Sequence, residues 1–209
     1  MSRIFVSLSL LPLILVVSTM GVGWWIGDYN GVYSQVMAEA RANPGGTDSE
    51  RLAKDRETLA EPQRRFKIHF QLGLATSLAV VLINSLSVTY LIGTSRWVKE
   101  VCEAYGLDSK HIEASTRIKR ATFPWSISGV FAILVVIALG AASDPGTLRD
   151  TTANWVTPHL IGALIGACII LIAIFLQAIN LHRNSQIIED VVAEVQRERE
   201  ARGLPVEAS

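Results

Sequence analysis

The sequence predicts an all-α fold: an integral membrane four-helix bundle with cytoplasmic helical extensions. Half of the 209 residues are hydrophobic and the formal net charge is zero, but the apolar residues gather in the blocks 4–26, 68–94, 123–142 and 156–181. Each block reaches the roughly 20 residues that a helix needs to cross the hydrocarbon core of a bilayer. The balanced charge leaves no basic footprint for nucleic acid, so the expected partner is the lipid bilayer.

Residues 1–27 are expected to form the first transmembrane helix. The apolar block is longer than that of a typical signal peptide. It ends in GVGWWIGDYN, without a cleavage site built from small residues. These two features favour an uncleaved anchor over a cleaved signal peptide.

Residues 28–66 form a connector that is expected to be partly helical. Pro44 and the two glycines after it break the chain, and Thr47 or Asp48 can then cap a polar helix that Pro62 ends. The segment has too few large apolar residues to bury a core of its own. We therefore expect a connector or a small cap over the bundle.

Residues 67–183 hold the second, third and fourth transmembrane helices, and charge predicts their orientation. The loop 96–120 carries the basic residues Arg96, Lys99, Lys110, Arg117, Lys119 and Arg120. The turn between the third and fourth helices carries only Arg149. Because short basic loops stay in the cytoplasm, we expect a multi-pass protein of the bacterial inner membrane. Both termini are then cytoplasmic and residues 28–66 periplasmic.

Three cations at the other end of the second helix oppose this orientation. Arg64, Arg65 and Lys67 lie on the periplasmic side, where the positive-inside bias disfavours them. Either the orientation is reversed, or these cations have a role outside the membrane.

Residues 184–209 are expected to form a cytoplasmic amphipathic helix and tail. One face of this helix is apolar and carries Ile187, Ile188, Val191, Val192 and Val195. Past the second apolar block, Trp97, Val101 and Tyr105 recur at a spacing of four residues. The two segments could pack on each other and close the cytoplasmic end of the bundle.

Two transmembrane helices carry stripes of polar and small residues, and each stripe begins with a histidine. At 100° per residue, His69 heads a stripe of Gly73, Thr76, Ser77, Asn84, Ser87 and Thr94, and His159 heads one of Gly162, Gly166, Ala173, Gln177 and Asn180. Polar groups avoid lipid, so both stripes should face the bundle interior. We expect Asn84 and Gln177 to find hydrogen-bond partners there.

The two histidines suggest a cofactor site. Both open an outward-to-inward helix at similar depth, so His69 and His159 could face each other and ligate the iron of haem b. Gly73, Gly162 and Gly166 would let the macrocycle approach the helix backbones. The cations Arg64, Arg65 and Lys67 would then bind the haem propionates.

The structural reading of the same histidines carries more weight. Gly162 and Gly166 form a common close-packing motif of membrane helices, and a histidine near the interface often bonds a neighbour or water. Another metal is poorly supported because no Asp, Glu or Cys accompanies the pair. His182 has no partner at matching depth, and His111 is expected to be solvated.

One segment resembles a known group of proteins. The stretch VTYLIGTSRWVKEVCEAYGL, with His69 a helix length upstream, is similar to a segment of small four-helix inner-membrane proteins of bacteria that carry no assigned activity. The resemblance covers residues 69–107 and implies a bacterial inner-membrane placement but no chemistry. The sequence contains no recognised enzyme motif, so whether the chain is an enzyme stays open.

Two functions remain in competition. The first is a b-type haem electron-transfer subunit with bis-histidine ligation. The alternative is a non-enzymatic structural or anchor subunit without a cofactor, which binds a membrane-complex partner or forms a homo-oligomer. A transporter is less well supported because no Asp, Glu, Lys or Arg lies deep within an apolar block.

Overall fold

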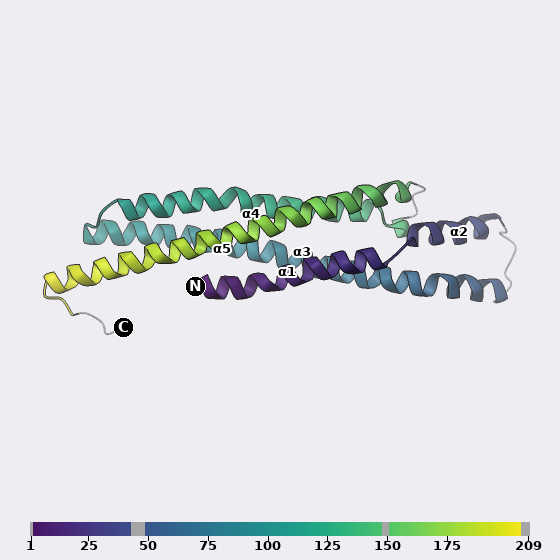
Figure 1. Cartoon of the computed structure of the whole chain (residues 1–209), viewed down its shortest axis with the longest axis horizontal. Helices are drawn as coiled ribbons and strands as arrows, with labels where there is room; N and C mark the ends of the chain where they lie inside the picture. The colour runs from purple at the N-terminus through teal and green to yellow at the C-terminus, as the bar shows by residue number, and fades with distance from the viewer. Residues whose placement is uncertain (1, 43–48, 148–150, 206–209) are drawn as a thin grey trace. The chain divides into compact units, whose positions relative to one another are not determined.

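The chain folds into helices joined by short connections (Figure 1). A computed structural model describes residues 2–42, 49–147 and 151–205, and these residues form no strand. The elements are α1 (Ser2–Trp25), α2 (Tyr29–Ala42), α3 (Ser49–Tyr105), α4 (Lys110–Ala142) and α5 (Val156–Ala201), with the 3-10 turns η1 (Pro145–Thr147) and η2 (Thr152–Trp155) before α5. Among the described residues, four helices are long and apolar enough to cross a membrane. The expected all-α class and the four apolar helices are confirmed.

The helices pass through two compact units, which we describe separately. The His-pair unit comprises Leu11–Val80 and Phe131–Ile169. The basic unit comprises Met1–Leu10, Val81–Val130 and Ile170–Ser209. Each unit therefore contains a part of α1, α3, α4 and α5.

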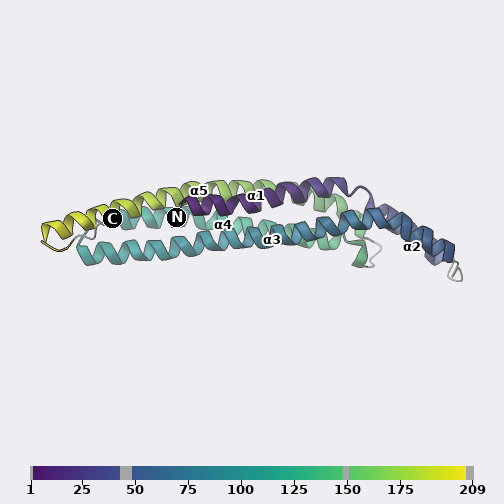
Figure 2. The same ribbon diagram turned by 90° about the horizontal axis from the view of Figure 1, so that it is seen from below.

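Helix α3 begins much earlier than its apolar block and continues beyond it (Figure 2). The expectation that Pro62 ends a separate polar helix is wrong, because α3 runs through this proline. Proline removes one helical hydrogen bond, but Glu61, just before it, accepts bonds from Arg64 and Arg65, just after it. These bonds connect the helical turns before and after Pro62. The expected caps Thr47 and Asp48 lie outside the described residues.

Helix α2 packs on the N-terminal part of α3 rather than forming a core of its own. Tyr29 is buried and its ring stacks on Phe66 with a centroid distance of 4.9 Å. The Asn30 amide donates to the Ser143 carbonyl at 3.1 Å and accepts from the Thr152 hydroxyl at 3.2 Å. The connector is thus held by the turn between α4 and α5.

The expected loop 96–120 is mostly helical. Only residues 106–109 separate α3 from α4. Gly106 takes a left-handed φ of 70°, and the Leu107 amide donates to the Cys102 carbonyl at 2.9 Å, an arrangement that ends α3. Asp108 then accepts the Lys110 amide at 2.9 Å, and this bond lowers the pKa of its carboxyl. Because Gly106 ends α3 and Asp108 caps the first turn of α4, the connection between the two helices can be short.

In the basic unit, α5 packs on α3 and the start of α4. Val98, Cys102 and Val191 are buried together. The partly buried residues around them are Val101, Leu107, Ile112, Ile187, Ile188 and Val195. The expected packing of the two extensions is confirmed, although the contact on α3 runs through Val98 and Cys102 rather than Trp97 and Tyr105.

Buried polar side chains pair with one another inside the basic unit. The Gln177 amide donates to Asn84 Oδ1 at 2.9 Å, and the two side chains are at most 1% exposed. Further along α5, Asn184 donates to Thr94 Oγ1 at 2.9 Å. The expectation that Asn84 and Gln177 face the interior and are hydrogen-bonded is confirmed.

Burial along the helices reveals an internal repeat. The buried positions of α5 follow those of α3 at the constant step that separates His69 from His159. The matched pairs are Val80 and Ile170, Ile83 and Ala173, Asn84 and Ile174, Ser87 and Gln177, and Leu91 and Leu181. Helices α1 and α4 match in the same way, with the buried pairs Phe5 and Thr122, Ser9 and Ser126, and Val16 and Ile133. The pairs α1–α3 and α4–α5 are therefore two copies of one arrangement.

The bond between Asn84 and Gln177 should contribute measurably to stability. Asn84→Leu and Gln177→Leu should each lower the free energy of unfolding in detergent by about 1 kcal/mol, because each removes the buried hydrogen bond between the two side chains. The double variant should lose less than the sum of the two. Gln71→Leu, on an exposed position of α3, is the control. Strict additivity of the two losses would contradict the pairing.

Candidate functional site: the histidine pair

The structure brings His69 of α3 and His159 of α5 together in the His-pair unit. Their ring centroids lie 6.2 Å apart and the ring planes are nearly perpendicular, at 80°. Both side chains are half-buried. The residues are distant in sequence, so their proximity depends on two separate helices.

The His69 ring is held against α1. Its Nδ1 lies 3.1 Å from the Thr19 carbonyl oxygen, and because a carbonyl can only accept, Nδ1 carries the proton. One turn along α1, a Cβ added to Gly23 would lie 2.9 Å from His69 Cε1. Gly23 therefore leaves the space that the ring occupies. In the neutral ring, the lone pair is on Nε2.

The His159 ring lies against α4 in the same way. A Cβ added to Gly140 would lie 3.1 Å from His159 Cε1. His159 Nδ1 is buried, and the Val136 carbonyl, one turn before Gly140, approaches it without closing a bond of good geometry. Thr19 with Gly23, and Val136 with Gly140, thus form equivalent cradles on the two copies of the repeat.

Sequence reasoning missed these cradles. Gly23 and Gly140 lie at the ends of the first and third apolar blocks, in helices that carry no conspicuous polar stripe. A signal was nevertheless present, because Ser9 and Ser126 precede Gly23 and Gly140 by the same interval. The shared serine–glycine spacing indicates equivalent inward faces only when the burial of Ser9 and Ser126 is known.

Gly73, Gly162 and Gly166, the glycines expected to approach a macrocycle, do not contact the two histidine rings. A Cβ on Gly162 would collide with the Leu139 side chain, and one on Gly166 would lie 2.7 Å from Val136 Cγ2. These two glycines pack α5 closely on α4. A Cβ on Gly73 would meet nothing within 4 Å.

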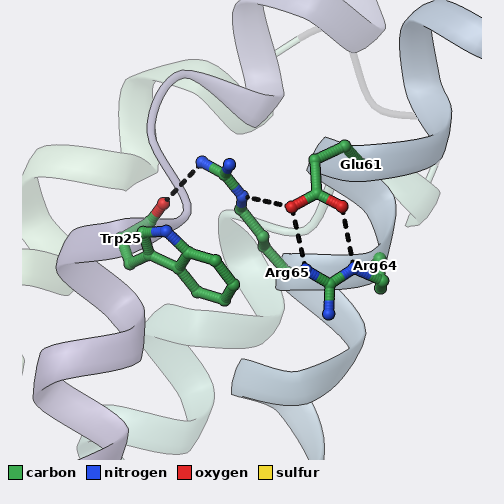
Figure 3. Close-up of polar contacts among 4 residues, drawn as sticks. All are labelled: Trp25, Glu61, Arg64 and Arg65. Carbon is green, nitrogen blue, oxygen red and sulfur yellow. Dashed lines mark hydrogen bonds and ion pairs between the residues drawn. The ribbon is translucent and has the colours of Figure 1, made fainter.

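The cations expected at haem propionates form a cluster with Glu61 and Trp25 (Figure 3). Arg64 and Arg65 donate to the Glu61 carboxylate at 2.8 and 2.9 Å. Arg65 also donates to the Trp25 carbonyl at 3.2 Å, and its guanidinium lies 4.5 Å from the centre of the Trp25 ring. Lys67 is exposed. The arginines therefore link the part of α3 that follows Pro62 to the end of α1.

The other two histidines lie in the basic unit. The expectation that His111 is solvated is wrong: it is 7% exposed, and its Nε2 lies 2.8 Å from Glu194 Oε2. The contact forms because α5 extends far enough to cover the start of α4. His182 is exposed.

The donor set limits the chemistry of the site. Among the described residues, no group of three or more His, Cys, Asp and Glu side chains could hold a metal ion. A structural or catalytic zinc site needs at least three protein ligands, so two imidazoles alone do not suit it. Two axial imidazoles are sufficient for haem, because the macrocycle supplies the other ligands.

Comparison with known proteins does not assign the chain. No family model, curated protein or solved structure matches it. Its function is therefore inferred from the geometry of its own residues.

The cradle glycines should be sensitive to one added methyl group. Gly23→Ala should destabilise the protein by about 1–3 kcal/mol, because a Cβ 2.9 Å from His69 Cε1 forces the ring to move. Gly140→Ala, with a contact of 3.1 Å to His159 Cε1, should have a smaller effect. Gly21→Ala, on the same helix, would place its Cβ in open space, so it should be neutral or stabilising. Thermal unfolding in detergent measures the difference. Equal stability of Gly21→Ala and Gly23→Ala would contradict the tight contact with His69.

Proposed function

We propose that the chain is a b-type haem electron-transfer subunit of the bacterial inner membrane, with His69 and His159 as the two axial ligands. The observation that supports this proposal is the paired placement of the two imidazoles on equivalent positions of a repeat. Membrane proteins with internal repeats can place a binding site at the interface between the repeats. A single iron between His69 and His159 would lie between equivalent positions of the two copies.

The ring separation suits a shared iron. With about 2 Å from the metal to each imidazole nitrogen, the two ring centroids lie about 6 Å apart, close to the 6.2 Å between His69 and His159. The nearly perpendicular planes are compatible with ligation, because each ring can rotate about its own metal–nitrogen bond. The separation of the two ring centroids therefore supports a shared iron that both histidines would hold.

The second nitrogen of the His69 ring also supports the proposal. Metal-ligating histidines usually donate their other N–H to a carboxylate or a backbone carbonyl. His69 Nδ1 donates to Thr19, which leaves Nε2 for a metal. The His159 ring lies near the Val136 carbonyl, but its buried Nδ1 makes no hydrogen bond of good geometry to the described residues. The bond to Thr19 thus orients the His69 ring before any ligand arrives, and the second ring is positioned by its packing against Gly140.

The chain supplies the rest of the environment. Haem, when bound, provides a one-electron redox centre. Gly23 and Gly140 leave the space in which the two rings lie. Arg64, Arg65 and Lys67 offer positive charge for propionates, although the two arginines would then share these anions with Glu61.

A cofactor-free structural or anchor subunit is the second candidate. It is favoured by contacts that need no ligand: the close packing of Gly162 and Gly166 on α4, and the bond between Asn84 and Gln177. In this case His69 acts through its bond to Thr19, and the partner is a membrane complex or a second copy of the chain.

Visible absorption distinguishes the two candidates. The purified, detergent-solubilised protein should show a low-spin bis-histidine haem spectrum that sharpens on dithionite reduction. A haem-free spectrum after expression with haem supplementation, and no binding of added haemin, would eliminate the haem proposal and leave the structural one.

Variants locate the ligands. His69→Ala and His159→Ala should each abolish the low-spin reduced spectrum, because one axial ligand is lost. His182→Ala is the control, since this histidine is exposed, and it should leave the spectrum unchanged. His111→Ala is a poorer control because it also removes the contact with Glu194. A normal spectrum in either axial variant would show that the ligands lie elsewhere.

The proposed orientation places both termini in the cytoplasm. Reporter fusions after Gly106 and after Ser209 should report cytoplasm, and a fusion after Gly46 should report periplasm, because the basic residues of 96–120 resist translocation. A periplasmic signal after Gly106 would reverse the orientation and move the histidine pair to the cytoplasmic side.

A further inference from the structure

A shallow groove lies between α3 and α4 in the basic unit. It has a volume of about 380 Å³ and is open along one side. Its lining is Ile92 of α3 with Lys119, Arg120, Phe123 and Pro124 of α4. A second groove along α4 shares Arg120 and is lined by Ile112, Glu113, Thr116, Arg117 and Arg120.

The groove combines exposed apolar side chains with cations. Ile92 is 52% exposed and Phe123 is 44% exposed. On α4, Lys119 and Arg120 stand four and three residues before Phe123, so the cations lie one helical turn from the aromatic ring on the same side of the helix. A molecule bound here therefore meets charge at one end and hydrocarbon at the other.

The cations of the groove differ from three other basic residues of this unit, each of which pairs with a carboxylate. Arg96 pairs with Glu100, Lys99 with Glu103, and Lys110 with Asp108. In the described part of the chain, no ion pair joins Lys119 or Arg120 to a carboxylate, and Glu113 lines the neighbouring groove rather than this one. Positive charge is thus left available beside an apolar surface.

We propose that this groove binds an anionic phospholipid, with the phosphate at Lys119 and Arg120 and an acyl chain along Ile92 and Phe123. Basic pockets between membrane helices recognise anionic head groups in this way. A soluble anion would use the cations but leave the apolar lining uncovered. A zwitterionic lipid would fill the groove with no net charge for the cations to attract.

The test uses the full chain reconstituted in vesicles of phosphatidylcholine that contain a spin-labelled phosphatidylglycerol or a spin-labelled phosphatidylcholine. Electron paramagnetic resonance reports the fraction of each lipid that is immobilised by the protein. The wild type should immobilise phosphatidylglycerol preferentially. Lys119→Gln combined with Arg120→Gln should reduce this preference by about tenfold, since each cation near an anionic lipid contributes a several-fold factor.

The matched control is Arg96→Gln combined with Lys99→Gln, which removes the same charge from the exposed surface of α3 outside the groove. It should retain most of the preference. Thermal unfolding checks that both double variants are folded. Equal immobilisation of the two lipids by the wild type, or equal losses in the two double variants, would overturn the proposal. So would full competition by millimolar inorganic phosphate, which would show a free-anion site.

Discussion

Hydrogen bonding between side chains on different helices is the constraint on which the packing of these apolar helices depends. A buried amide cannot bond to water, so its hydrogen-bond partners must come from the protein. The Gln177 side chain donates to Asn84 Oδ1, although Gln177 Oε1 is buried without a partner among the described residues, and this bond favours one register of α5 on α3. A slip of one turn would break the bond. Apolar packing alone does not discriminate registers in this way.

The same register recurs at the other contacts of α5. Asn184 meets Thr94, and Glu194 meets His111, each at the position that a continuous α5 dictates. Because α5 is a continuous helix, the register set by Gln177 and Asn84 also determines which residues meet farther along the basic unit. The apolar cluster around Val98 and Val191 then continues the packing of the two helices beyond the contact of Asn184 with Thr94.

The internal repeat explains why the histidines occur as a pair. In each copy, one helix presents a backbone carbonyl and a glycine, and the next helix presents a histidine ring to them. A single copy would hold one imidazole beside a carbonyl, which is a common structural contact. The two copies bring the two imidazoles together, with their ring centroids 6.2 Å apart. The proposed haem site thus combines two copies of a simple contact, in which Gly23 and Gly140 make room for the rings.

The sequence by itself determined the four apolar helices, the inward faces of α3 and α5, and the candidates His69 and His159, because hydropathy and the 100° rotation per residue are local properties. It did not reveal that α3 continues through Pro62, where Glu61 bonds to Arg64 and Arg65 across the proline. Only the tertiary structure showed that His111 is buried by Glu194 and that Gly23 and Gly140, rather than Gly162 and Gly166, contact the rings. Those facts depend on which residue of one helix meets which residue of another, and no single helix contains that information.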